Sequence, residues 1–395
     1  MDASTRRPRR LAAKLLVLAL GVLVGVGVLE VGVRLMGAVP QSVRIAGLGG
    51  EVPSGENVEG EGLPDQSLYV RTPTGVRLKR STRAVVRNHN LSKRDVEITT
   101  NALGFRHPEL GPKKRGERRV LVLGDSITFG DYVDADQTYP AHLERALRMG
   151  DAAGSSRLQV INAGVGAIDL QNMLAILMET GLSAEPDFIL VGLYLNDAYH
   201  SPYLEVSRLP APLGRSALAS HLANQLDLLR ARQLVRGSPR AAMQHFQQAR
   251  AELAAAHPGG PGNYRTDPRA FDRIVLEAFT DWGYAWSPRY WQKIESLLAI
   301  IEQVATERGI GLAVALLPVK QQVEAGHVHD APQRQFAALM ERMSIPHLDV
   351  LPVLRALPKG EVDALFYDHC HYTPGGNRIV GEAMAELVGP LLSPR

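Results

Sequence analysis

Residues 118–130 read RRVLVLGDSITFG, and this stretch decides the fold class of the chain. Its apolar run, from Val120 to Leu123, is bounded by two arginines on one side and by a glycine on the other. A short and continuously apolar run is typical of a β-strand that is buried on both faces, as in a parallel sheet covered by helices. A polar turn, Asp125-Ser126, follows the strand directly.

The same alternation of strand and helix patterns recurs along the rest of the chain. One predicted helix begins with Ser287 as its N-cap and Pro288 in its first turn. Alternation of this kind implies right-handed crossovers and a parallel sheet covered on both faces. We therefore predict an α/β fold of three α/β/α layers, similar in arrangement to flavodoxin. Its five parallel strands are residues 118–124, 158–164, 187–195, 310–318 and 345–350, and its main helices are residues 138–150, 170–182, 287–309 and 373–392.

Changes in composition suggest the boundaries of the domains. Residues 37–117 begin with a Gly-, Pro- and Ser-rich stretch, which predicts a flexible stalk, and continue as a small lead-in with short strands. The α/β domain is predicted over residues 118–395. Between about residue 200 and residue 286 the alternation stops. Residues 216–235 and 239–258 have helical patterns and GGPGNYRTDPR (259–269) breaks the run, which predicts an inserted helical cap. A substrate lid and a solvated helical decoration both fit this insertion.

The N-terminal segment is basic and then apolar. Four arginines lie within residues 1–10, and an uncharged run extends from Leu15 to Leu29. Lys14 can snorkel toward the basic side, which extends the apolar span to about 19 residues, close to the length that a bilayer requires. We expect a basic cytoplasmic tip at 1–10 and a transmembrane signal-anchor at 11–36, so that the single-pass protein exposes its α/β domain on the periplasmic or extracellular side. A cleaved signal peptide remains the alternative.

Composition excludes several classes of protein. The chain has 395 residues, 45% hydrophobic and 22% charged, which is an ordinary globular balance. Its formal net charge of +3 is too small for a dedicated nucleic-acid protein, and we expect no nucleic-acid partner. The only cysteine is Cys370, so an internal disulfide is excluded.

Polar or glycine-bearing stretches follow four of the predicted strands, at the edge of the sheet where open α/β proteins place their sites. Each stretch has an ordinary explanation as a helix cap, a tight turn or an Asx-turn. Together they are the residues GDS at 124–126, NAGVGA at 162–167, YLND at 194–197 and DHCH at 368–371.

In their order and separation these four stretches resemble the blocks of the SGNH hydrolases, also called the GDSL esterase/lipase superfamily. The resemblance covers residues 118–395 apart from the insertion, and the lead-in TTNALGFR (99–106) and the N-terminal segment resemble those of membrane-anchored bacterial members. The resemblance implies that Ser126 is the nucleophile and that Asp368 and His371 are its partners through D-x-x-H.

The resemblance also implies an oxyanion hole. Its donors would be the backbone N–H of Ser126, the side-chain amide of Asn196 and a backbone N–H of the second block. Spacing from the start of that block matches Ala167, with Gly166 just before it, and either N–H could serve. The third block departs from the family pattern G-x-N-D, because Tyr194 stands where the glycine is usual. This tyrosine would narrow the pocket beside Asn196.

The cluster at 368–371 is open to three interpretations: a catalytic pair, a zinc site and a cysteine nucleophile. D-x-x-H spacing selects His371 and leaves His369 and Cys370 without a chemical step. A zinc site is disfavoured because neighbouring side chains on an extended stretch point to opposite faces, and no second cysteine or H-E-x-x-H motif is present. We expect no metal and no organic cofactor.

The implied reaction is acyl transfer. The resemblance implies a serine esterase that removes an acyl group, acetyl or another short one. The expected membrane tether and external location suggest that the substrate is an envelope or exported glycan or a lipid. The expected partners are an acylated carbohydrate or a lipid ester, and the membrane through the N-terminal helix. Two alternatives remain open: an O-acyltransferase acting on a polysaccharide, and a non-catalytic glycan-binding scaffold with the same fold.

Overall fold

The computed structural model describes residues 6–35, 68–72, 75–150, 157–198, 216, 218–219, 222 and 239–392. The chain divides into two compact units, each described by itself below. The smaller comprises residues 1–45 and 205–236, and the larger comprises residues 46–204 and 237–395.

Helix α1 (Arg6–Leu35) belongs to the smaller unit. Its Glu30 carboxylate accepts hydrogen bonds from the Ser216 hydroxyl (2.8 Å) and the Leu218 N–H (2.9 Å). Large apolar side chains between Val17 and Val31 are 48–70% exposed. Among the described residues, no helix is both long and apolar enough to cross a membrane. The transmembrane span expected at 11–36 is therefore not confirmed, and the expected stalk at 37–67 lies outside the described residues.

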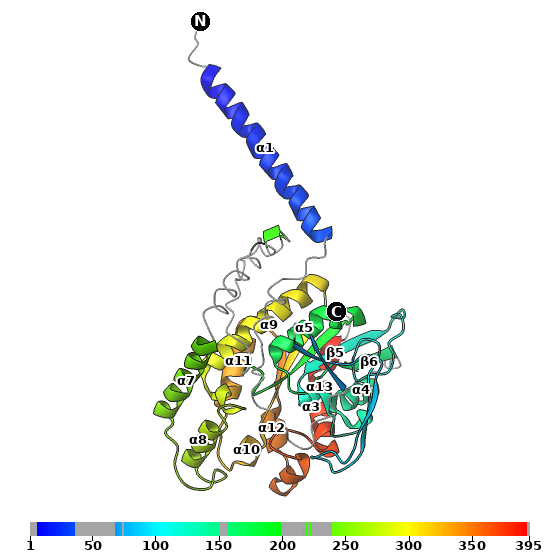
Figure 1. The fold of residues 1–395 in the computed structure, drawn as a ribbon, viewed down its shortest axis with the longest axis vertical. Helices are drawn as coiled ribbons and strands as arrows, with labels where there is room; N and C mark the ends of the chain where they lie inside the picture. Colours follow the sequence, from blue (N-terminus) through cyan, green and yellow to red (C-terminus); the bar gives the residue numbers. More distant parts are fainter. Residues whose placement is uncertain are drawn as a thin grey trace. The chain divides into compact units, whose positions relative to one another are not determined.

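The larger unit is built on a five-stranded parallel sheet, seen edge-on among the helices of Figure 1. Its strands are β5 (Arg118–Gly124), β6 (Leu158–Asn162), β7 (Phe188–Tyr194), β8 (Gly311–Leu317) and β9 (His347–Asp349). They lie in the order β6-β5-β7-β8-β9, and every neighbouring pair is parallel. All five predicted strands are confirmed. The first has the predicted bounds, and the other four are shorter at their ends.

Helices cover both faces of this sheet. In the sheet β6 lies on one side of β5, whereas β7, β8 and β9 follow one another on the other side. Because the crossovers are right-handed, this change of direction places the connecting helices on different faces of the sheet. On one face α4 (Tyr139–Gly150) packs against α13 (Pro374–Leu392). On the other face α9 (Pro288–Arg308) packs between α5 (Leu170–Glu179) and α11 (Ala331–Met343). The three-layer α/β/α arrangement is confirmed.

The start of α9 follows the sequence prediction. Ser287 is its N-cap and accepts a hydrogen bond from the Arg289 N–H (3.3 Å), and Pro288 is its first residue. One turn further on, the buried Tyr290 hydroxyl donates to the carbonyl of Tyr194 (2.6 Å). This bond ties α9 to the end of β7.

The described part of the insertion consists of α7 (Pro239–Ala256), α8 (Pro268–Glu277) and the 3₁₀-helix η6 (Gly283–Trp286). The sequence pattern predicted a helix for α7 and a break after it. The other predicted helical segment, at 216–235, lies almost entirely outside the described residues. Four elements between β8 and α13 were not predicted: α10 (Lys320–Glu324), α11, α12 (Val350–Arg355) and η7 (Lys359–Leu365). Of these, α11 could have been recognised from the helical spacing of its buried apolar residues.

The lead-in forms two antiparallel strand pairs. They are β1 (Tyr69–Thr72) with β2 (Gly75–Leu78), and β3 (Arg83–Val86) with β4 (Val96–Thr99). Arg106, in the segment after β4, is 4% exposed and donates to the carbonyls of Phe129 (2.9 Å), Gly130 and Val133 (2.8 Å). The lead-in thus holds the loop that follows the GDS turn.

We predict that Arg106→Ala destabilises the protein by about 2 kcal/mol or more, because it removes the buried hydrogen bonds that the guanidinium donates to the carbonyls of Phe129, Gly130 and Val133. Arg83→Ala is the matched control, since Arg83 is exposed and its ion pair with Glu97 lies on the surface. Urea unfolding of the full-length protein should show a lower midpoint for the first variant and an unchanged midpoint for the second. Equal midpoints would mean that the Arg106 bonds do not anchor the loop.

Candidate active site

Ser126 lies at the first residue of the short helix α3 (Ser126–Phe129), directly beyond the carboxyl end of β5. Asp125 caps this helix, because its carboxylate accepts a hydrogen bond from the Ile127 N–H (2.9 Å). Glycine is required at 124, where a Cβ atom would lie 1.8 Å from the Thr128 Oγ1. Asp125 is therefore an ordinary helix cap, as the sequence allowed. Ser126 beside it is half-buried.

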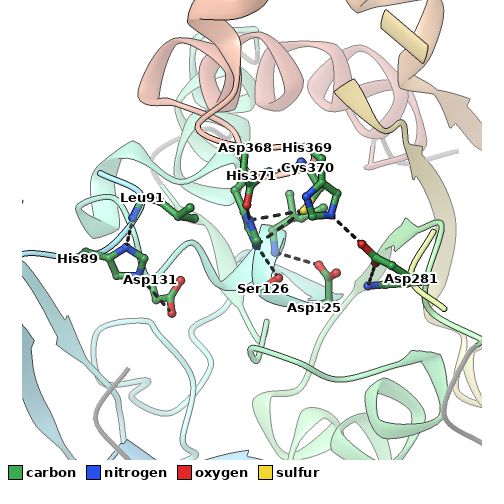
Figure 2. A network of polar contacts seen from close by, with 12 residues as sticks. His89, Leu91, Asp125, Ser126, Asp131, Asp281, Asp368, His369, Cys370 and His371 are labelled. Carbon is green, nitrogen blue, oxygen red and sulfur yellow. Dashed lines mark hydrogen bonds and ion pairs between the residues drawn. The ribbon is translucent and has the colours of Figure 1, made fainter. Parts of the chain in front are cut away.

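The three residues predicted as a triad form one chain of hydrogen bonds (Figure 2). Ser126 Oγ lies 2.9 Å from His371 Nε2, and His371 Nδ1 lies 2.7 Å from Asp368 Oδ2. The other carboxylate oxygen of Asp368 accepts the N–H groups of Cys370 and His371, both at 2.8 Å. Because Asp368 only accepts, Nδ1 carries the imidazole proton and Nε2 is left to accept from Ser126. The arrangement can withdraw a proton from a serine hydroxyl.

The charges around the site keep His371 basic. Burial lowers the pKa of His371, but the hydrogen bond and charge of Asp368, with the charges of Asp125 and Asp131, outweigh burial and raise it above its ordinary value. Burial acts to raise the pKa of Asp368, yet its bonds to His371 and to two backbone N–H groups bring that pKa well below the usual range. Asp368 is therefore ionised at any physiological pH.

We predict that a fluorophosphonate labels Ser126 faster as the pH rises, with a midpoint above 6.5. Only the neutral imidazole accepts the serine proton, and the pKa of His371 is raised from 6.5. In Asp368→Asn the midpoint should move to lower pH, because burial still lowers the pKa of the imidazole while the charge that raised it is gone. Labelling rates measured between about pH 5 and 9 test this. An unchanged midpoint in the variant would show that Asp368 does not raise the pKa of His371.

Cys370 lies beside the triad but is unsuited to attack. It is buried, and burial raises the pKa of its thiol well above the ordinary value, so the thiol stays protonated. Its Sγ is 3.5 Å from His371 Nδ1. Ligand atoms of Asp368, Cys370 and His371 all lie within 4.8 Å of one another. The hydrogen bond between Asp368 and His371 accounts for this proximity without an ion.

The second block is tied to the helix of Ser126. The side-chain amide of Asn162 donates to the Thr128 carbonyl (2.8 Å), and its oxygen accepts the Gly164 N–H (3.0 Å). Gly164 allows the close approach, since a Cβ atom there would lie 2.4 Å from the backbone nitrogen of Phe129. The Val165 N–H donates to the Gly124 carbonyl (3.2 Å).

Two N–H groups of this block have no acceptor within the part of the chain that the structure describes. They belong to Gly166, which is half-buried, and to Ala167, which is exposed and has a positive φ of 56°. Either can donate to a bound oxyanion, so the geometry keeps both residues as candidates.

Asn196 follows β7 in a turn that Asp197 holds together. The Asp197 carboxylate accepts the Tyr194 N–H (2.7 Å), and the Asp197 N–H donates to the Tyr194 carbonyl (3.2 Å). The side chain thus bonds to a residue before it and not to one after it, as it would in an Asx-turn. The side-chain amide of Asn196 donates to Asp281 Oδ1 (3.3 Å). Tyr194 itself is 1% exposed, so its ring belongs to the core.

Two residues beside the site were missed by sequence reasoning. The ring of Tyr132 is buried and meets the His371 ring edge-on, with centroids 5.0 Å apart. Asp281, from the insertion, contacts Asn196 and also pairs with His369 Nε2 at 3.0 Å (Figure 2). No spacing rule connects either residue to the four blocks. Tyr132 could have been suspected only from its closeness in sequence to the GDS turn.

No protein-family profile matches the chain, and no curated protein does so. Among solved structures, a lipase/acylhydrolase from Enterococcus faecalis is similar at 12% identity and a TM-score of 0.38, over 70% of this chain and 98% of that one. An acetyl xylan esterase is similar at 14% identity and a TM-score of 0.37, over 68% and 99%. A variant of an acetyl-xylooligosaccharide esterase from Geobacillus is similar at 13% and 0.39, over 69% and 94%.

The chain resembles the SGNH hydrolases. The resemblance lies in the parallel sheet with GDS after its first strand and D-x-x-H before its last helix. Because the TM-scores are below 0.5, the solved structures say nothing about the reaction. What Ser126 can do follows from its own contacts.

Proposed function

We propose that the protein is an ester hydrolase of the SGNH type, which removes an acetyl or short acyl group from an envelope or exported glycan or lipid. The observation that carries the proposal is the hydrogen-bonded chain from Ser126 through His371 to Asp368. A serine whose hydroxyl faces a neutral imidazole nitrogen, oriented in turn by a carboxylate, is suited to attack a carbonyl carbon.

The proposed reaction has two halves. His371 Nε2 takes the proton of Ser126 as Oγ attacks the ester carbonyl, and the resulting imidazolium is stabilised by Asp368. The oxyanion accepts hydrogen bonds from the Ser126 N–H, from Gly166 or Ala167, and from the Asn196 amide. His371 then returns its proton to the leaving alcohol, which leaves an acyl-serine. Water, deprotonated by His371, then attacks the acyl carbonyl. His371 returns this proton to Ser126 Oγ as the acyl–serine bond breaks, and the free acid leaves the restored enzyme.

The partial exposure of the triad favours water as the final acceptor. The His371 and Asp368 side chains are 18% and 27% exposed, so solvent reaches the imidazole that must deprotonate it. Transfer to a sugar hydroxyl would use the same residues and yield an acylated glycan in place of free acid. Quantifying free acetate and acylated product from an acetylated oligosaccharide separates the two reactions.

We predict that the full-length protein hydrolyses p-nitrophenyl acetate and that Ser126→Ala abolishes both turnover and fluorophosphonate labelling. Cys370→Ser is the matched control, because the buried and protonated thiol has no part in the proposed reaction. It should keep most of the activity and all of the labelling. Labelling that survived Ser126→Ala and disappeared in Cys370→Ser would reverse the assignment of the nucleophile.

We also propose that the protein is held at the membrane, with the α/β domain on the periplasmic or extracellular side. The support is the basic tip at 1–10, the uncharged run from Leu15 to Leu29, and the exposure of the apolar side chains along α1. A set of exposed apolar side chains of this kind is suited to contact lipid. The basic residues would remain in the cytoplasm.

We predict that the full-length protein sediments with membranes and resists extraction by alkaline carbonate, whereas a variant lacking residues 1–36 is recovered in the supernatant. A reporter fused after Arg395 should be active only outside the cytoplasm. Activity of the reporter in the cytoplasm would exclude the proposed orientation. A mature protein beginning near Val39 would indicate a cleaved signal in place of an anchor.

A further inference from the structure

We propose that Asp281 is a positioning residue for Asn196, and that His369 completes this second polar chain beside the triad. The inference rests on the proposed function, in which the Asn196 amide donates to the oxyanion. It assigns a role to Asp281, a carboxylate of the insertion, and a role to His369, to which the D-x-x-H spacing gives none. The chain runs from Asn196 Nδ2 to Asp281 Oδ1 (3.3 Å), and from Asp281 Oδ2 to His369 Nε2 (3.0 Å).

The backbone around Asn196 is held firmly, but its side chain is not. Asp197 fixes the turn through the Tyr194 N–H, and Tyr290 binds the Tyr194 carbonyl. The side-chain oxygen of Asn196 is buried and has no hydrogen-bond partner among the described residues. Its amide nitrogen bonds to Asp281. The hydrogen bond to Asp281 is thus the contact that sets the rotation of the Asn196 side-chain amide.

Asp281 can perform this task because the backbone that carries it is anchored on both sides. Phe279 and Trp282 are 1% and 4% exposed, so the segment between α8 and η6 is packed into the core of the insertion. The Asp281 N–H donates to the Ala278 carbonyl (2.9 Å). At Gly283 a Cβ atom would lie 2.0 Å from the Val275 carbonyl oxygen, so only glycine allows this path.

His369 is held from the opposite side. Its carbonyl accepts the Lys320 N–H (2.8 Å), and its ring points to Asp281, whereas the ring of His371 points to Ser126 (Figure 2). The insertion and the D-x-x-H loop therefore meet at one carboxylate.

The chemistry of the carboxylate explains why it orients the amide. An ionised carboxylate accepts and cannot donate, so it bonds only to the NH₂ end of Asn196 and turns that end toward the site. One N–H of the amide is used by Asp281, and the second remains for the oxyanion. A bare carboxylate near a developing oxyanion would oppose it. The His369 N–H bonded to Asp281 offsets this negative charge.

The test is a double-mutant cycle on p-nitrophenyl acetate with the full-length protein. Asn196→Ala should lower kcat by about 10²–10³-fold, as expected for the loss of one oxyanion donor. Asp281→Ala should lower kcat about tenfold with little change in KM, and should have almost no further effect in the Asn196→Ala background. Asp281→Asn should recover most of the kcat lost in the alanine variant, because its side-chain oxygen still accepts the amide. His369→Ala should lower kcat less than Asp281→Ala.

Glu277→Ala is the matched control, since Glu277 is an exposed carboxylate of the insertion that pairs with Arg273. It should leave kcat unchanged. If Asp281→Ala lowers kcat by the same factor with and without Asn196, Asp281 does not act through Asn196 and the inference fails.

A second measurement does not depend on turnover. In ¹⁵N-labelled full-length protein, the side-chain amide signals of Asn196, assigned by their loss in Asn196→Ala, should shift in Asp281→Ala and return toward their original positions in Asp281→Asn. Unmoved signals would overturn the inference. If these signals behave as expected while wild-type hydrolysis does not depend on Ser126, the proposed function fails and the positioning contact stands.

Discussion

The hydrogen bond between Ser126 and His371 joins residues 245 positions apart in the sequence, and much of the fold exists to make it short. Asn377 links the start of α4 to the segment that carries His371. The side-chain oxygen of Asn377 accepts the Tyr139 N–H at the start of α4 (3.0 Å), and its amide donates to the Tyr372 carbonyl next to His371 (2.9 Å). Because Asn377 is fully buried, both bonds are costly to lose and hold α4 and α13 in register.

Buried polar contacts hold the loops at the carboxyl edge of the sheet. Arg106 gathers the carbonyls after α3, Asn162 ties the second block to Thr128, and Asp197 closes the third block. Each contact satisfies backbone groups that a loop leaves without partners. The same contacts leave a few groups open beside Ser126, and those groups are the ones that the proposed reaction uses.

The insertion contributes a side chain to the polar contacts beside Ser126. From the sequence pattern it could be a lid or a decoration, and its first predicted helix, at 216–235, lies almost entirely outside the described residues. The structure shows that its anchored segment presents Asp281 to both Asn196 and His369. His369, to which the D-x-x-H spacing assigns no chemical step, contacts the insertion through Asp281. The polar contacts beside Ser126 thus extend to a residue outside the four blocks, Asp281.

The sequence by itself determined the layers of the fold, the parallel sheet and the identity of Ser126, Asp368 and His371 as candidates. The layers and the sheet follow from patterns within a few residues, such as continuous apolar runs for the buried strands and Ser287-Pro288 at the start of α9. The three candidate residues follow from the resemblance of four separate blocks to the SGNH hydrolases. Only the tertiary structure decided the partners of Arg106, the turn of His369 toward Asp281, and the contact between Asp281 and Asn196. The last pair is 85 positions apart, and its bond depends on how the insertion folds back over the sheet. No periodicity or spacing encodes such a contact, because it arises from the meeting of two separately anchored loops.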